Sequence, residues 1–233
     1  MSKYNFFTRL CPLLLLLLPI LVLGTSYCVD YKNFIQFLII VIILIGLGFL
    51  LSTIDKNFGK KKEKELWKEW GSSPIALLLN YNNFLIDEET KDRYHSKLLK
   101  LLPTSKKIDF KTAYLSELNL IYNWWGMYLI KHIPDNQDNS LLNKKNIRYG
   151  FRRHIWGLKK LSIKMISFSL IGNFLFHQKD NTFNFLKLSL DFYISESILL
   201  VILIIWVVFV NTDWVKTSAF DYSKRLLKNI DGL

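Results

Sequence analysis

The hydrophobic residues of this chain are collected into long blocks, and most of the polar residues lie between them. Two blocks near the N-terminus, residues 11–29 and 34–53, contain no charged residue. Each is long enough to cross the roughly 30 Å hydrocarbon core of a bilayer as a helix. Two more blocks, residues 161–177 and 192–210, follow a long polar stretch. The pattern predicts an all-α membrane protein with two pairs of transmembrane helices.

The third block, residues 161–177, is the shortest and has polar side chains among its apolar ones. Polar groups inside a bilayer are stable when they face another helix or a water-filled cavity rather than lipid. We therefore expect the polar side chains of this block to face neighbouring helices. They are Lys164, Ser167, Ser169 and Asn173.

The first block, residues 11–29, is preceded by Lys3 and Arg9, as the apolar region of a signal peptide would be. Its small-residue cleavage pattern is poor and the block is long, so we favour a retained span, with a cleaved signal peptide as the alternative. Pro19 is expected to kink the helix. The two cysteines of the chain lie at opposite ends of this block, too far apart for a disulfide.

Residues 54–160 predict a helical module between the two apolar pairs. A serine followed by proline is typical of a helix start, so Ser73 predicts a short helix over residues 74–79. Asp87 is placed to cap a second helix, which should continue to about Leu102 because a proline follows it.

The longest helix of the module is expected over residues 110–133, with Asp109 as its cap. Apolar residues recur there with the 3.6-residue period of a helix that buries one face. The expected buried face consists of Tyr114, Leu118, Ile121, Tyr122, Trp125 and Leu129. At the end of the chain, residues 211–233 alternate apolar and basic residues. This predicts an amphipathic helix that returns to the module or lies on the membrane surface.

The distribution of charge predicts an orientation in the membrane. The chain has a formal net charge of +12 and 51% hydrophobic residues. Residues 54–160 carry 21 basic and 12 acidic residues, a net +9, whereas the links 30–33 and 177–191 are neutral. Because basic residues concentrate on the cytoplasmic side, we expect residues 54–160 and both termini in the cytoplasm, with the chain in a bacterial inner membrane.

Together these patterns predict four regions. They are a first transmembrane hairpin (residues 1–53), a cytoplasmic helical module (54–160), a second transmembrane hairpin (161–210) and an amphipathic cytoplasmic tail (211–233).

One 13-residue segment, Arg148–Lys160, contains five Lys or Arg residues, three aromatic residues and two glycines. A cationic, aromatic segment directly before an apolar block is typical of the cytoplasmic edge of a bilayer. The same composition suits a ligand, because Lys and Arg pair with phosphate and aromatic rings stack on bases. The candidates for either role are Arg148, Tyr149, Phe151, Arg152, Arg153, Trp156, Lys159 and Lys160.

The sequence offers little catalytic chemistry. Its histidines and cysteines lack metal-ligand spacing, so neither a metal nor a cofactor is expected. The phosphate-binding and nucleophile motifs are also missing. Arg148 and His154 are spaced like the Arg and His of HEPN ribonucleases, where the pair performs acid–base chemistry on RNA. These two are the only catalytic candidates. A non-enzymatic role is favoured, and nucleic acid is not an expected partner.

A carboxylate interrupts the fourth block at Glu196, between Ser195 and Ser197. An ionisable group inside a bilayer is costly, by about 2.5–3.5 kcal/mol at the centre of an inserted helix. The spans offer no evident ion partner for it within one protomer. Glu196 and its two serines are therefore candidates for lining a pore in an oligomer, unless the carboxylate merely reaches the outer interface.

The stretches Leu66–Gly71 (LWKEWG) and Tyr149–Lys159 (YGFRRHIWGLK) are similar to segments of uncharacterised bacterial multi-pass proteins. With the layout of two spans, a basic module and two spans, the chain resembles the small four-helix membrane effectors of bacterial antiphage defence. The resemblance covers about 17 residues in motif, and Asn is usual in it where this chain has His154.

This resemblance implies an effector that oligomerises and permeabilises the membrane when a cytoplasmic nucleotide messenger or protein partner acts on its module. The alternatives are a membrane-tethered HEPN-like ribonuclease and a non-enzymatic scaffold or transport subunit.

Overall fold

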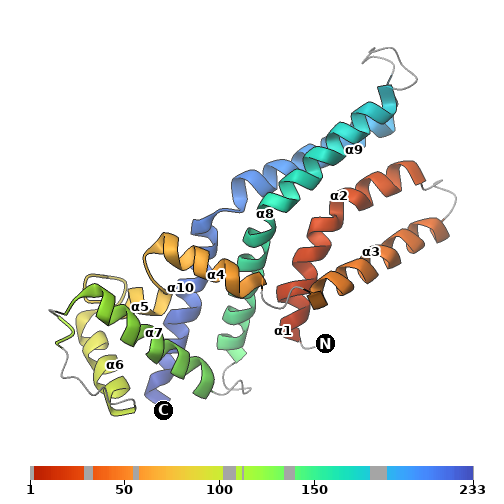
Figure 1. Ribbon diagram of the computed structural model, residues 1–233. Helices are drawn as coiled ribbons and strands as arrows, with labels where there is room; N and C mark the ends of the chain where they lie inside the picture. Colours follow the sequence, from red (N-terminus) through yellow and green to blue (C-terminus); the bar gives the residue numbers. More distant parts are fainter. Residues whose placement is uncertain are drawn as a thin grey trace. The chain divides into compact units, whose positions relative to one another are not determined.

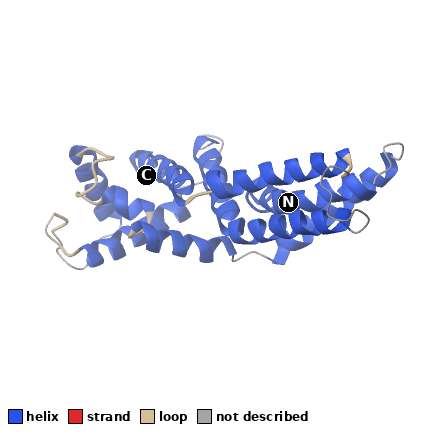
Figure 2. Ribbon diagram, turned by 90° about the horizontal axis from the view of Figure 1, so that it is seen from above, coloured by secondary structure: helices blue, strands red, loops and turns tan. Residues whose placement is uncertain are grey.

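The computed structural model describes residues 3–28, 34–54, 58–101, 109–111, 113–133, 140–178 and 188–232. Over these residues every regular element is a helix and none is a strand (Figure 2). The all-α prediction is confirmed.

The chain forms two compact units, each built from two stretches of sequence. We call Met1–Lys60 with Gly150–Trp214 the apolar unit, and Lys61–Tyr149 with Val215–Leu233 the polar unit. Three helices, α4, α8 and α10, continue from one unit into the other along the chain.

Long helices dominate the apolar unit (Figure 1). The elements of this unit include α1 (Lys3–Asn5), the π-helical turn η1 (Phe6–Leu10), α2 (Cys11–Cys28), α3 (Phe34–Ile54), the later part of α8 (Ser140–Gln178), α9 (Leu190–Ile204) and the π-helical turn η4 (Ile205–Phe209). Helix α2 packs along α3 and along α9. It contains Pro19 and changes direction part-way along its length (Figure 1), as the sequence predicts.

Among the described residues, two helical stretches are long and apolar enough to cross a membrane, Lys3–Gly24 and Leu190–Phe209. The predicted span over residues 34–53 is the helix α3, Phe34–Ile54, and Leu38–Leu50 is the apolar stretch found in it among the fully described residues. The predicted span over residues 161–177 lies within α8 and does not meet the same test, because its lysine, serines and asparagine lower its hydropathy. Length and composition thus support two of the four predicted spans.

The polar residues of 161–177 are only partly as expected. Ser169 and Asn173 are buried against other helices, as predicted, and Ser167 is half-buried. Lys164 is exposed, contrary to the prediction. It lines a cavity together with Phe168.

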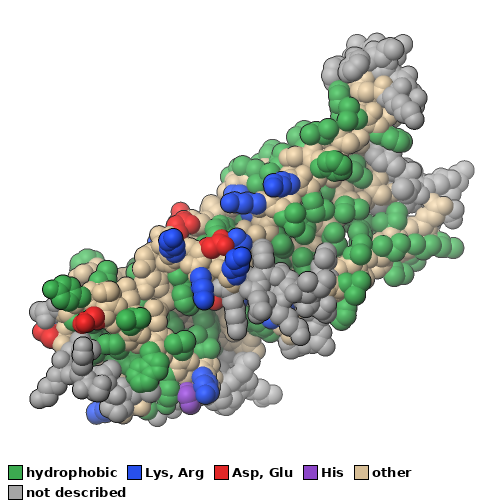
Figure 3. Space-filling view, in the orientation of Figure 1, with side chains coloured by type: hydrophobic (Ala, Val, Ile, Leu, Met, Phe, Trp, Pro, Cys, Tyr) green, Lys and Arg blue, Asp and Glu red, His purple; other side chains and the backbone are tan. Residues whose placement is uncertain are grey.

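Large apolar side chains remain exposed on the apolar unit. On α3 these include Ile35, Ile42, Ile43 and Leu50, and on α9 and η4 they include Val201, Ile204, Val208 and Phe209. Figure 3 shows hydrophobic side chains spread over α3 and α9, and charged side chains gathered over α4. The unit also has a buried core, which includes Ile166 and Leu199, both fully buried.

The polar unit is a cluster of shorter helices (Figure 1). They are the later part of α4 (Phe58–Trp70), α5 (Pro74–Leu79), α6 (Glu88–Leu101), α7 (Leu115–His132), the start of α8, most of α10 (Thr212–Lys228) and the 3-10 turn η5 (Asn229–Gly232). Its fully buried residues include Leu66, Leu78, Leu98, Tyr122, Trp125 and Leu226.

Two predicted helix starts in the polar unit are confirmed. The Ser73 hydroxyl accepts a hydrogen bond from the Ala76 amide at 3.3 Å and caps α5. The Asp87 carboxylate accepts one from the Thr90 amide at 2.7 Å and caps α6. Helix α6 ends at Leu101, and the residues that follow it lie outside the described part of the chain.

The predicted start of the long helix is wrong. Helix α7 begins at Leu115 rather than residue 110. Asp109 instead closes a turn, in which its carboxylate accepts the Lys111 amide at 3.0 Å and its carbonyl accepts the Ala113 amide at 2.9 Å. Tyr114, placed on the buried face by periodicity, is consequently 80% exposed.

The rest of the predicted buried face of α7 is largely correct, since Leu118, Tyr122, Trp125 and Leu129 are buried and Ile121 is half-buried. Helix α10 is amphipathic as predicted. Its buried face includes Ala219, Tyr222 and Leu226 and packs within the polar unit. The sequence predicts a tail that either packs on the helical module or lies on the membrane surface. In the structure it packs within the polar unit.

Candidate functional site

The polar residues of the third and fourth apolar blocks meet in the apolar unit. The Asn173 side-chain amide, on α8, donates to the Glu196 carboxylate at 2.6 Å and to the Ser195 hydroxyl at 3.2 Å. Ser195 donates in turn to the Phe192 carbonyl at 3.0 Å. Asn173 is 2% exposed and Ser195 is fully buried. We call Asn173, Ser195 and Glu196 the polar cluster.

This cluster gives Glu196 a neutral donor within its own chain. An ionised carboxylate has about four acceptor positions, so one amide donor occupies only part of its capacity. Ser197, the third pore-lining candidate, is exposed on the helix surface. The structure therefore groups Ser195 and Glu196 with Asn173 and leaves Ser197 outside the cluster.

Polar groups also join the end of α8 to the start of α9. The His177 ring nitrogen Nε2 lies 3.1 Å from the Ser189 hydroxyl, and the His177 ring lies 5.0 Å from that of Phe192. The Ser189 hydroxyl accepts the Phe192 amide and caps α9. Polar contacts thus tie α8 to α9 at two levels along the pair.

Two basic residues of the Arg148–Lys160 segment bind the end of η4 and the start of α10. The Lys159 ammonium donates to the carbonyls of Val207 and Val210 at 3.0 and 2.7 Å. The last carbonyls of a helix lack intrahelical partners and carry partial negative charge, so a lysine is favourable there. Arg152 donates to the Trp214 carbonyl at 2.7 Å, and its guanidinium lies 4.8 Å from the centre of the indole ring.

A glycine of this segment has a packing role. A Cβ on Gly150 would lie 2.7 Å from Thr8 Cγ2, so α8 approaches the N-terminal helix closely at this position. A second glycine, Gly59 at the start of α4, packs on His154, whose ring would be 2.5 Å from an added Cβ.

The remaining candidates of the segment are dispersed. Tyr149, in the polar unit, donates its hydroxyl to Glu63 at 2.7 Å and stacks on Tyr222. Phe151 and Trp156, in the apolar unit, pack against its buried core. Arg153 is half-buried, whereas Arg148 and Lys160 are exposed. The described side chains of the segment therefore do not converge on one ligand cavity.

His154 is buried rather than presented to a substrate. It is 5% exposed, and its Nδ1 lies 3.2 Å from the Gly150 carbonyl. Burial, with a smaller contribution from the Arg153 charge, lowers the pKa of His154 to about 4. A general acid–base residue must come within hydrogen-bond reach of its substrate. The position of His154 does not favour the ribonuclease alternative.

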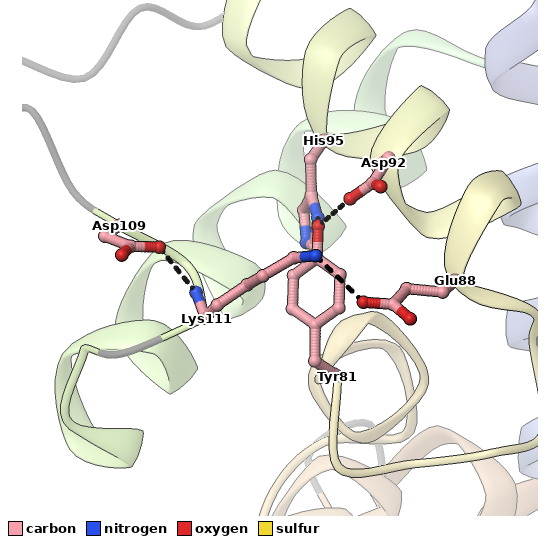
Figure 4. Close-up of polar contacts among 6 residues, drawn as sticks. All are labelled: Tyr81, Glu88, Asp92, His95, Asp109 and Lys111. Atoms are coloured by element: carbon pink, nitrogen blue, oxygen red, sulfur yellow. Dashed lines mark hydrogen bonds and ion pairs between the residues drawn. The ribbon is translucent and has the colours of Figure 1, made fainter.

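A second polar network lies in the polar unit around the buried His95, and its charged members are exposed (Figure 4). The Tyr81 hydroxyl donates to the Asp92 carboxylate and lies 2.9 Å from His95 Nδ1. Because the Tyr81 proton is directed at Asp92, we infer that His95 Nδ1 carries a proton and donates to the phenol oxygen. The Lys111 ammonium pairs with Glu88 at 2.9 Å and lies over the Tyr81 ring (Figure 4).

The aromatic surroundings of His95 determine its protonation. The imidazole is 4% exposed, and the rings of Phe110, Tyr122 and Trp125 lie within 5.7 Å of it, centre to centre. Burial lowers the pKa of His95 to about 4, so the ring is neutral at pH 7. Burial, together with the hydrogen bond to Asp92, raises the pKa of the Tyr81 phenol. The network joins the loop before α6 to α6 and α7.

Sequence reasoning did not find either network. The partnership of Asn173 with Glu196 had a usable signal, because both residues lie a similar distance from the link between the third and fourth blocks. An antiparallel hairpin brings such positions to the same level. His95 had no comparable signal, since its partners Tyr81 and Phe110 lie in turns.

Among the described residues, no group of three or more His, Cys, Asp or Glu side chains could hold a metal ion. Comparison of the chain with family models, curated proteins and solved structures finds no match.

Proposed function

We propose that this protein is a multi-pass membrane effector of bacterial antiviral defence. Its polar unit receives a cytoplasmic signal, and its apolar helices oligomerise and permeabilise the inner membrane. The polar cluster carries the proposal, because it places a carboxylate inside a helix pair whose outer surface is otherwise apolar. The resemblance in sequence and layout supplies the biological setting.

The surface of the apolar unit supports a location in lipid. In the stretch Leu190–Phe209, 22% of the most apolar window is buried, so most of its side chains face outward. Exposed apolar surface on this scale is rare on soluble monomers and marks membrane or protein contacts. The large exposed side chains of α3 extend the same kind of surface. Lipid, together with further copies of the chain, would cover it.

The polar cluster also supports a permeation role over a purely structural one. A half-buried carboxylate between apolar helices needs water, a donor or a cation, and Asn173 supplies one donor. Assembly of several copies would bring several Glu196 side chains near a common axis. Such a ring favours cations and holds water in an otherwise apolar path.

The proposed topology places both termini and residues 54–160 in the cytoplasm, with the link 178–191 outside. It rests on the alternation of charge along the chain. Reporter fusions at Asn181 should be active only in reporters that require export. Activity of a cytoplasmic reporter at this position would contradict the topology.

Ion flux through liposomes tests the proposed function. We expect the purified wild-type protein to conduct cations, and Glu196→Gln to insert normally but to lower the flux or its cation preference. Ser197→Ala is the matched control, because this exposed residue is next in the chain and outside the polar cluster. Wild-type flux and selectivity in Glu196→Gln, or no flux from any preparation, would contradict the proposal.

A further inference from the structure

A cavity of about 540 Å³ lies within the polar unit, between α6 with the loop before it and α10. Helix α6 contributes Thr90, Arg93 and Tyr94, and α10 contributes Lys224 and Lys228. The volume is within the range of pockets that hold small molecules, about 300–1,000 Å³. None of these residues belongs to the Arg148–Lys160 segment.

The cavity gathers positive charge. Lys224 and Lys228 are four residues apart, so they lie on one face of α10, where like charges repel. Arg93 adds a third cation from α6. Among the described residues that line the cavity, Asp87 is the single acid, and its carboxylate already accepts the Thr90 amide as the cap of α6. Asp87 also interacts electrostatically with Arg93, and three cations against this one carboxylate leave a net positive cavity.

The Tyr94 ring of α6 restricts the position of the Arg93 side chain. The Arg93 guanidinium lies over the Tyr94 ring, 5.6 Å from its centre, and Tyr94 is 3% exposed. A guanidinium held on a buried ring loses less freedom when it pairs with an anion.

We propose that this cavity binds a phosphate-bearing molecule, with Arg93, Lys224 and Lys228 pairing with the phosphate oxygens. Arg offers two parallel N–H groups to a phosphate, and the two lysines supply point charges. The phosphate belongs either to a soluble small molecule or to a lipid headgroup. This inference rests on the proposed function. It identifies the signal that the polar unit receives as a phosphate-bearing molecule.

Binding is measured on the full chain in nanodiscs of phosphatidylcholine, by calorimetry with pyrophosphate and with ATP. Adenosine is the phosphate-free control. Lys224→Gln/Lys228→Gln is compared with Lys131→Gln/Lys144→Gln, which removes the same charge from exposed positions that do not line the cavity. We expect the first double variant to weaken binding at least about tenfold, or about 1.4 kcal/mol, and the control to stay near wild type.

A second arm separates the two sources of phosphate. Nanodiscs that also contain phosphatidic acid are analysed for lipid that stays bound after detergent extraction. Binding of pyrophosphate or ATP, lost in Lys224→Gln/Lys228→Gln, supports the site with a soluble ligand. Retention of phosphatidic acid, lost in the same variant while soluble phosphates do not bind, supports the site with a lipid.

The inference is overturned if wild-type protein binds neither probe, or if Lys224→Gln/Lys228→Gln binds either as wild type does. Thermal unfolding of every variant shows whether a loss reflects unfolding, and Lys224→Gln alone serves if the double variant does not fold. Failure of the proposed function would be seen separately, as absent ion flux from protein that still binds phosphate.

Discussion

The two units bury polar groups in opposite settings. In the apolar unit the polar cluster lies between helices whose outer surfaces are apolar. In the polar unit the buried His95 ring lies among aromatic rings, and the charged members of its network, Asp92, Glu88 and Lys111, are exposed. The same chemistry, a buried group held by hydrogen bonds, thus has different surroundings. The difference teaches that a buried polar side chain is hydrogen-bonded whatever surrounds its unit, Asn173 with Glu196 and His95 with Tyr81.

Basic residues follow the same division. In the apolar unit, Lys159 and Arg152 are committed to backbone carbonyls near the end of η4 and the start of α10. In the polar unit, Lys224 and Lys228 face a cavity instead. Other cations of the polar unit pair with carboxylates of the chain, as Lys111 does with Glu88 and Lys145 with Asp221.

The largest expected effect concerns the aromatic core of the polar unit. Trp125→Ala should lower the free energy of unfolding of this unit by about 3–5 kcal/mol, because it removes a fully buried indole beside His95. Trp124→Ala is the matched control, because Trp124 is next to Trp125 on α7 and is 43% exposed. Denaturant titration monitored by circular dichroism measures both. Equal losses would show that the aromatic cluster is not the core that the structure indicates.

The second effect is a pH dependence of the polar unit. His95 has a pKa of about 4 in the fold against an ordinary 6.5, so protonation favours the unfolded chain. Its contribution is therefore fully present above pH 6.5 and is lost as the pH falls toward 4. Unfolding free energies should drop by up to about 3 kcal/mol more in wild type than in His95→Phe over this range. Parallel pH profiles would contradict the burial of a neutral His95.

The third effect concerns the hydrogen bonds of Asn173 in the apolar unit. Asn173→Leu removes the amide that donates to Glu196 and Ser195, and leaves the carboxylate without that donor. We expect the apolar unit to lose about 1 kcal/mol of stability in detergent, as interhelical hydrogen bonds in membranes contribute. Ser167→Leu, at a half-buried position of the same helix, is the control. Thermal unfolding in detergent micelles measures both variants. An equal loss of stability in Ser167→Leu would contradict a specific role for the Asn173 amide.

The smallest effect concerns the cap of η4. Lys159→Met keeps the apolar stem and removes the ammonium that donates to Val207 and Val210. A cation at a helix C-terminus contributes about 0.3–1 kcal/mol, so the melting temperature in detergent should fall by a few degrees at most. Lys160→Met, at the exposed neighbouring residue, should leave it unchanged. An equal shift in the two variants would indicate a general charge effect.

Local features of the fold could be predicted because neighbouring residues cause them. Ser73 and Asp87 cap helices with their own side chains, and the bonds reach only three residues along the chain. The amphipathic pattern of α10 is likewise a matter of 3.6-residue spacing. Apolar blocks became helices for the same reason, since backbone groups in such blocks are best satisfied within the segment itself.

Prediction failed where a local preference competed with a distant contact. Periodicity favoured a helix from residue 110 and a buried Tyr114. In the structure Phe110 stacks on His95, 5.0 Å away, and Lys111 pairs with Glu88. These contacts to α6 hold residues 109–111 in a turn, and α7 begins after it.

The sequence by itself determined the all-helical class, the apolar blocks and the capped starts of α5 and α6, because each depends on residues within about one helical turn. Only the tertiary structure decided which side chains meet. Lys159 binds the carbonyl of Val210 from 51 residues away, and the Asn173–Glu196 contact, although consistent with a hairpin, needed the structure to show it. The cavity between α6 and α10 joins residues from distant parts of the chain. Such pairings follow from the packing of whole helices. The free energy gained by burying apolar area between helices far exceeds that of any single polar contact.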